Sequence, residues 1–178
     1  MVAALLEAAT KLFAEVGPGV VSLRDVAKEA NVNLGLIHRY IGSKQDLLAA
    51  VLAARPGMPP THEVALSSAD DIVDVILQQI AADAPYTRIM LRAAIEGFEL
   101  RQLQDVFPLT ERAAKSARAG LPRRDADVRV ALLVSAILGW QAIGPAMLEV
   151  LKHRNLSDVE IDEALRPALA AFLNAEPS

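Results

Sequence analysis

Several polar side chains within residues 22–48 have the types and positions needed to bind nucleic acid. Lys44 lies at the expected start of a helix, where a cation is unfavourable unless an anion is nearby, so a phosphate partner would account for it. Ser22 and Arg24 open another expected helix and should reach the DNA backbone. His38 can donate a hydrogen bond to a phosphate or to a base acceptor.

The remaining groups that could do chemistry form neither a catalytic site nor a metal site. The three histidines, His38, His62 and His153, are far apart, and none has a second histidine three or four residues away. Acidic residues cluster near 70–74 and 158–163, but there they open expected helices, where carboxylates suit the helix dipole. With no cysteine, no nucleophile elbow and no phosphate loop, the sequence predicts no enzyme, no metal and no cofactor.

The elements that would position the nucleic-acid groups are short helices joined by a tight turn. Ser22 can cap a helix that ends near residue 30, and Asn31 tolerates the left-handed conformation that such a turn demands. Asn33 can cap a second helix over 34–40, and Ser43 can cap a third that begins near residue 44. In a helix-turn-helix the second helix enters the major groove of DNA, while the first crosses the backbone.

The second helix of this motif has two distinct sides. Ile37 and Ile41 are four residues apart and apolar, so they should face the core. The residues expected on the outer side are Asn33, Leu34, Gly35 and His38. Glycine allows close approach of the backbone, and residues at the helix start meet base edges.

Residues 5–48 resemble the DNA-binding region of TetR-type transcriptional repressors. That family's pattern runs approximately T-x-x-x-I-A-x-x-A-G-V-S-x-G-x-x-Y-x-Y-F-x-x-K-x-x-L, and the matching residues are Val26, Ala27, Ala30, Val32, Gly35, Tyr40, Lys44 and Leu47. The segment LLEAATKLFAEVG resembles the family's usual first helix. The departures from the pattern are Asn31, Asn33, His38 and Ile41.

The resemblance implies a fold, a partner and further site residues. It implies an all-α protein with an N-terminal three-helix DNA-binding domain and a C-terminal helical domain for ligand binding and dimerisation. It makes Tyr40 a phosphate-contacting aromatic, and it implies dimerisation through the last two long helices, within residues 125–174.

The charge distribution is compatible with DNA but does not demand it. The chain has 178 residues and a net charge of −4, with five basic and five acidic side chains in residues 1–52. The neutral N-terminal part predicts modest, salt-sensitive non-specific affinity. This neutrality, and the lack of basic residues before the first helix, leave open a rival in which a ligand-binding dimer carries a vestigial DNA-binding module.

The rest of the chain also reads as helical. We place the domain boundary at 52–53, because a stretch rich in proline and polar residues follows at 55–67. Helices are expected at about 2–16, 68–82, from 85 through 98, 109–119, 125–143 and 157–174. The last of these begins at a capping box formed by Ser157 and Glu160.

Residues 130–148 form a segment without a charged side chain, and this segment is long enough to span a membrane. We favour a helix buried in a dimer core, since Ser135, Gln141 and the Gly144-Pro145 pair would interrupt a lipid-facing helix. A membrane-associated protein remains the less favoured alternative. The apolar side chains that could line a ligand pocket are Met90, Phe98, Phe107, Trp140, Ile143 and Met147.

Together these features predict a cytoplasmic, DNA-binding transcriptional regulator that acts on double-stranded DNA. We expect a homodimeric repressor, released from a palindromic operator by a small hydrophobic ligand.

Overall fold

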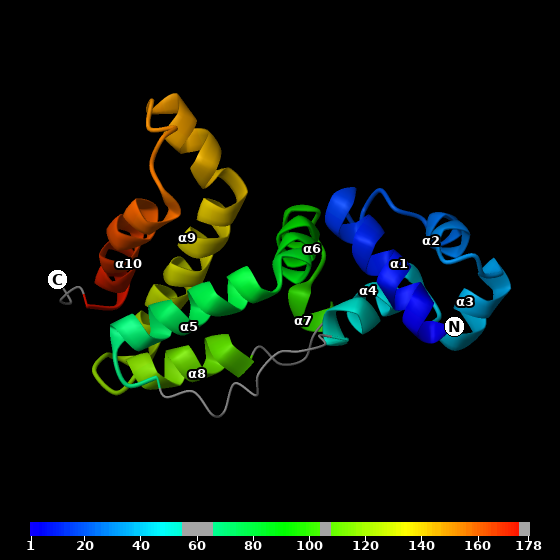
Figure 1. Ribbon diagram of the computed structural model, residues 1–178. Coiled ribbons are helices and arrows are strands. Elements are labelled where there is room, and N and C mark those ends of the chain that lie inside the picture. The colour runs from blue at the N-terminus through cyan, green and yellow to red at the C-terminus, as the bar shows by residue number, and fades with distance from the viewer. Residues whose placement is uncertain (55–65, 104–107, 175–178) are drawn as a thin grey trace. The chain divides into compact units, whose positions relative to one another are not determined.

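The computed structural model describes residues 1–54, 66–103 and 108–174, and these residues form helices and connecting turns without a β-strand (Figure 1). The helices are α1 (Val2–Glu15), α2 (Leu23–Glu29), α3 (Leu34–Tyr40), α4 (Lys44–Ala53), α5 (Ala69–Ala82), α6 (Ala84–Ile95), α7 (Leu100–Leu103), α8 (Pro108–Ala117), α9 (Arg123–Val150) and α10 (Asp158–Asn174). The all-α prediction is therefore confirmed.

The chain divides into two units, and the first contains α1–α4 together with α6 and α7. Helix α1 packs against α2, α4 and α6, and α4 packs against α7. Phe13, Ile37 and Leu47 are fully buried in this unit. The boundary at 52–53 follows the order of the sequence, whereas the contacts group α6 and α7 with the first four helices.

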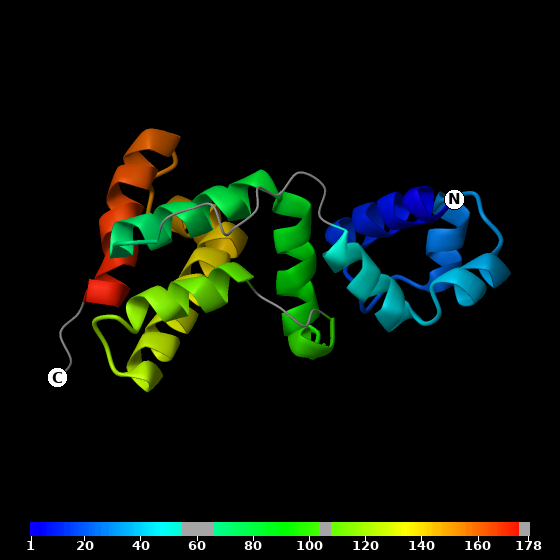
Figure 2. The same ribbon diagram turned by 90° about the horizontal axis from the view of Figure 1, so that it is seen from below.

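The second unit contains α5, α8, α9 and α10. Its core joins apolar side chains of all four helices, including Ile72, Ala113, Leu133 and Leu169. Helix α9 packs against both α8 and α10, and α9 and α10 run in opposite directions (Figures 1 and 2). Burial of these apolar stripes is what holds helices of this length together in water.

Most helix starts are those that the sequence predicts. The hydroxyl of Ser68 accepts a hydrogen bond from the backbone N–H of Asp71 at 3.0 Å, at the start of α5. At the start of α10, the backbone N–H of Ser157 donates to Glu160 Oε2 at 2.8 Å, and the backbone N–H of Glu160 donates to Ser157 Oγ at 3.3 Å. The predicted capping box is therefore confirmed.

Two predicted helix ends are wrong. Helix α6 ends at Ile95 and does not reach Phe98, because the chain leaves the helix through Gly97 with φ +82°. Helix α9 does not stop at residue 143 but continues through Gly144 and Pro145 to residue 150. Figure 1 shows that α9 bends in its last third, as expected for a helix with an internal proline.

Helix α9 has one buried side and one exposed apolar side. Val130, Leu133 and Ile137 are buried in the core. The outer face of α9, defined here as Val128, Leu132, Ile143 and Met147, is between 44% and 57% exposed. The prediction concerns burial in a dimer core, so it stays a prediction here, and within one chain this apolar face is exposed.

Within the described residues, α9 is also the one helix long and apolar enough to cross a membrane, with 22% of its most apolar window buried. Length and composition alone support this reading, and the core helix of a soluble protein can meet the same criterion.

Candidate nucleic-acid interface

Helices α2 and α3 form a helix-turn-helix whose ends are fixed by local hydrogen bonds. The hydroxyl of Ser22 accepts from the backbone N–H of Asp25 at 3.2 Å, and the backbone N–H of Ser22 donates to Asp25 Oδ2 at 2.8 Å. Asn31 occupies the turn with φ +51°, which confirms its predicted left-handed conformation. Asn33 Oδ1 then accepts from the backbone N–H of Gly35 at 2.7 Å and caps α3.

The two sides of α3 differ as its sequence predicts. Ile37 is fully buried and fixes the helix against the rest of the first unit. On the opposite side Asn33, Gly35 and His38 are exposed, and Leu34 is half-buried. A Cβ atom at Gly35 would meet only Asn33 Oδ1, at 3.2 Å, so the surface at Gly35 is open to a close approach. The helix therefore presents its first turns to solvent, as a recognition helix must.

Tyr40 and Arg39 lie together at the end of α3. Tyr40 is 54% exposed, so part of this residue is accessible to a partner. The Arg39 guanidinium carbon lies 5.5 Å from the centre of the Tyr40 ring, within the range of a cation–π contact. Arg24 is exposed in the first turn of α2.

Lys44 has a partner that its sequence context does not reveal. Its Nζ donates to the backbone carbonyl of Gly19 at 2.9 Å, so the loop between α1 and α2 supplies an oxygen for the ammonium. The predicted need for an anion at this helix start is therefore met in part by a carbonyl. A lysine ammonium carries three donors, so this one carbonyl does not use all of them.

Gly19, which accepts from Lys44 through its carbonyl, is also bound through its backbone N–H by Glu96, the residue that follows α6. The backbone N–H of Gly19 donates to Glu96 Oε2 at 2.5 Å, across 77 residues of sequence. A Cβ atom at Gly17 or at Gly19 would lie within 2.8 Å of the Glu96 carboxylate, so both glycines make room for it. Sequence reasoning missed this role of Glu96, because no local pattern indicates a partner so far along the chain.

Two carboxylates of this region have lowered pKa values. The Ser22 hydroxyl, and then the Ser22 backbone N–H, stabilise the ionised Asp25 and lower its pKa. The Ser43 hydroxyl and backbone N–H do the same for Asp46 at the start of α4. Both carboxylates therefore serve as acceptors at the helix starts. The Ser22 hydroxyl is already used in this way, because it donates to Asp25 Oδ2 at 2.6 Å.

The apolar residues predicted to line a ligand pocket are divided between the two units of the chain. Met90 is buried in α6 and Phe98 is half-buried beyond it, both in the first unit. Ile143 and Met147 are exposed on the outer face of α9, and Trp140 is half-buried in the same helix. Phe107 lies outside the described residues.

Comparisons with known proteins agree with this geometry. A family model described as bacterial regulatory proteins of the tetR family matches residues 5–51, which contain the whole helix-turn-helix. The HTH-type transcriptional repressor Rv3405c of Mycobacterium tuberculosis is 33% identical over 175 residues, which cover 96% of this chain and 88% of that protein.

Solved structures show the same fold over nearly the whole chain. HlyIIR, a hemolysin II transcriptional regulator, aligns with a TM-score of 0.64 and 18% identity over 98% of this chain and 97% of its own. BioQ of Mycobacterium smegmatis aligns with a TM-score of 0.65 and 19% identity over 98% and 96% of the two chains. Because the tetR family model matches the helix-turn-helix and a transcriptional repressor is similar over nearly the whole chain, the chain belongs to the TetR family of bacterial transcriptional regulators, which are DNA-binding proteins and not enzymes.

Proposed function

We propose that this regulator is a cytoplasmic repressor that binds a palindromic operator as a homodimer and leaves it when a small ligand binds. The observation that carries the proposal is α3, a capped helix with Ile37 buried and with Asn33, Gly35 and His38 exposed. Two such helices related by a two-fold axis would read half-sites about one helical turn of DNA apart.

In this proposal the residues of the helix-turn-helix and the start of α4 form two groups, one for the bases and one for the DNA backbone. Leu34, Gly35 and His38 meet base edges, together with Asn33 at the helix start, because they belong to the outer side of α3. The residues assigned to the DNA backbone are Ser22, Arg24, Tyr40 and Lys44. For Ser22 the supporting argument is its place at the start of α2, since its hydroxyl already serves the cap.

The homodimer is assigned to residues 125–174, which span most of α9 and all of α10. Its support is the outer face of α9, whose four apolar side chains are about half exposed in a single chain. An isologous interface would bury this face against its own copy. Ile143 and Met147 lie on that face, so the arrangement favours dimerisation over ligand binding as their role.

The ligand is proposed to be small and largely hydrophobic. Of the pocket residues expected from the sequence, Trp140 has the best support, because it lines a cavity of about 260 Å³ in the second unit. Met90 belongs to the core of the first unit, where its burial is already explained by packing.

The decisive experiment is a salt titration of operator binding with DNA from the region that flanks the protein's own gene. Lys44→Ala should weaken binding to all sequences alike and reduce the salt dependence by about one charge per subunit, whereas Lys44→Arg should preserve both. Lys115→Ala, which removes an exposed lysine of α8, is the matched control and should change neither.

His38→Ala should instead change the ranking among operator variants, at a cost of about 1–3 kcal/mol where a good base contact is lost. If the parent protein prefers no sequence over random duplex DNA, the vestigial-module reading is right. If Lys44→Ala leaves the salt dependence unchanged, Lys44 serves only the Gly19 carbonyl.

A further inference from the structure

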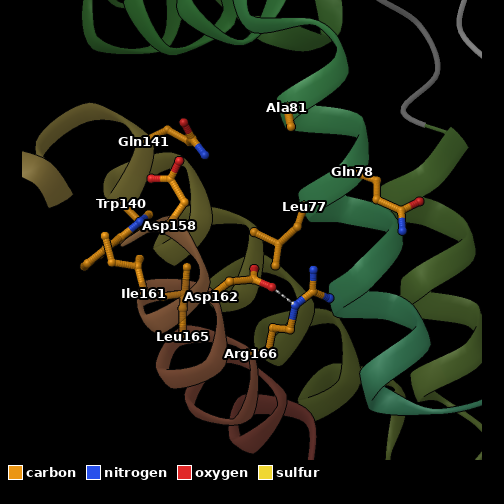
Figure 3. Close-up of a pocket in the computed structure, with 10 residues that line it drawn as sticks. All are labelled: Leu77, Gln78, Ala81, Trp140, Gln141, Asp158, Ile161, Asp162, Leu165 and Arg166. Carbon is orange, nitrogen blue, oxygen red and sulfur yellow. Dashed lines mark hydrogen bonds and ion pairs between the residues drawn. The ribbon is translucent and has the colours of Figure 1, made fainter. Parts of the chain in front are cut away.

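A cavity of about 260 Å³ lies between α5, α9 and α10 in the second unit (Figure 3). Its apolar lining comes from Leu77 of α5, Trp140 of α9 and Leu165 of α10. Its charged lining comes from Asp158, Asp162 and Arg166, all on α10. The cavity therefore offers an apolar side and a charged side to the same small molecule.

The positive charge in this cavity is already neutralised. The Arg166 guanidinium donates to Asp162 Oδ2 at 2.5 Å and also to the carboxylate of Asp74. One arginine is thus shared by two carboxylates. An anionic ligand would have to compete with both of them for Arg166, so the cavity is unsuited to an anion.

Asp158 adds a third carboxylate that has no such partner. Within the described part of the chain, its side chain forms no ion pair and no hydrogen bond, although it lines the cavity. Asp158 of α10 and Trp140 of α9 both line the cavity (Figure 3). The cavity lining itself holds two carboxylates, Asp158 and Asp162, and one guanidinium, so its side chains carry an excess of negative charge.

Trp140 is held in place by a glycine one turn further along α9. A Cβ atom at Gly144 would lie 2.6, 2.8 and 2.9 Å from three carbons of the indole ring. The ring therefore packs directly on the backbone at Gly144 while it also lines the cavity. A cavity lined by both an indole and a carboxylate can attract a cation in two ways, through the ring face and through the opposite charge.

We propose that this cavity binds a small organic cation, with its apolar body against Leu77 and Leu165 and its cationic group between Trp140 and Asp158. The inference deepens the proposed function, because it adds a positive charge to a ligand otherwise expected to be hydrophobic. It relies on that function only for the consequence of binding, not for binding itself.

The test compares two probes of nearly equal size, benzylammonium and the uncharged benzyl alcohol, by calorimetry and by the fluorescence of Trp140. Since the chain has one tryptophan, its emission reports on this cavity alone. Benzylammonium should bind at least about tenfold more tightly than benzyl alcohol, because only the cation gains from the carboxylate and the ring face.

Variants locate the effect. Asp158→Asn should weaken the binding of benzylammonium about fivefold to tenfold, which is the size expected for the loss of an exposed charge pair. The binding of benzyl alcohol should not change. Glu163→Gln, which neutralises an exposed carboxylate of α10 outside the cavity lining, is the matched control and should change neither probe. Trp140→Leu, followed by calorimetry, should weaken both probes.

The outcomes separate this inference from the proposed function. Equal binding of the two probes, or an Asp158→Asn variant that binds benzylammonium as the parent does, overturns the cation site and leaves Asp158 as a helix-start carboxylate only. Binding of neither probe at millimolar concentration overturns the ligand cavity itself. Binding of benzylammonium without loss of operator binding supports the cation site and contradicts ligand-driven release.

Discussion

The packing of Trp140 on Gly144 predicts a large and measurable coupling between these two positions. In an ordinary helix interior, Gly→Ala stabilises a protein by about 1 kcal/mol. At position 144 the added methyl group would approach three indole carbons to between 2.6 and 2.9 Å, all closer than such contacts allow. Forcing a ring out of a packed position costs about 1–3 kcal/mol. Gly144→Ala should therefore range from neutral to about 2 kcal/mol destabilising.

The same substitution should behave differently once the indole is gone. In a Trp140→Leu background the space beside residue 144 opens, so Gly144→Ala should recover the gain of about 1 kcal/mol expected from helix propensity. The coupling energy between the two sites should accordingly be about 1–3 kcal/mol in a double-mutant cycle.

The assay is urea unfolding of the four proteins at one fixed protein concentration, followed by circular dichroism. The emission of Trp140 in the Gly144→Ala variant gives an independent readout, since a displaced ring changes its solvent exposure. A coupling energy below about 0.5 kcal/mol, which is within the usual scatter of additive sites, would refute the packing argument. An unchanged emission spectrum would do the same.

Three further predictions follow from the contacts described above. Glu96→Ala removes the acceptor for the Gly19 N–H and should weaken operator binding about twofold to fivefold in fluorescence anisotropy, whereas Glu96→Gln keeps an acceptor oxygen and should restore most of it; equal affinities would contradict the role of Glu96. Ser43→Ala should lower thermal stability at neutral pH and have a smaller effect in acid, because the cap depends on an ionised Asp46. The folded pKa of Asp46 lies below its ordinary value of 3.8, so the stabilisation is present above 3.8 and is lost as the pH falls through the folded pKa. A pH-independent difference in melting temperature would argue against this linkage. Leu132→Glu places a charge on the outer face of α9 and should convert the dimer to monomers in light scattering, and a variant that stays dimeric would place the interface elsewhere.

Local features of the fold could be predicted from the sequence because their causes are local. The caps at Ser22, Asn33 and Ser43 bind backbone groups within three residues of themselves, so their sequence spacing is sufficient evidence. Asn31 in the turn is similar, since its left-handed backbone is an intrinsic tolerance of asparagine. The outer and inner sides of α3 follow from helical periodicity alone.

Features that depend on distant contacts could not be predicted. The continuation of α9 past Gly144 and Pro145 runs against the usual meaning of a glycine–proline pair, and it coincides with an indole packed on that glycine. The sequence pattern predicts a helix through residue 98 and gives no sign that Glu96 has a partner in Gly19, which lies 77 residues away in the sequence. The division of the expected pocket residues between the two units has the same origin, because apolar composition does not say which core or face receives each side chain.

The exposed side of α9 has a consequence for how the amount of protein controls its action. In the proposed dimer, pairing covers apolar side chains that a single chain leaves in water, so the pair is more stable than its separate chains, and this added stability grows with protein concentration. When copies are few, most chains are single and an operator that requires two recognition helices stays empty. Occupancy then rises with the square of the number of free chains, so a modest change in synthesis or degradation produces a sharper change in the response. With the interface proposed for α9, the apolar side chains of one helix would thus set a threshold copy number for regulation.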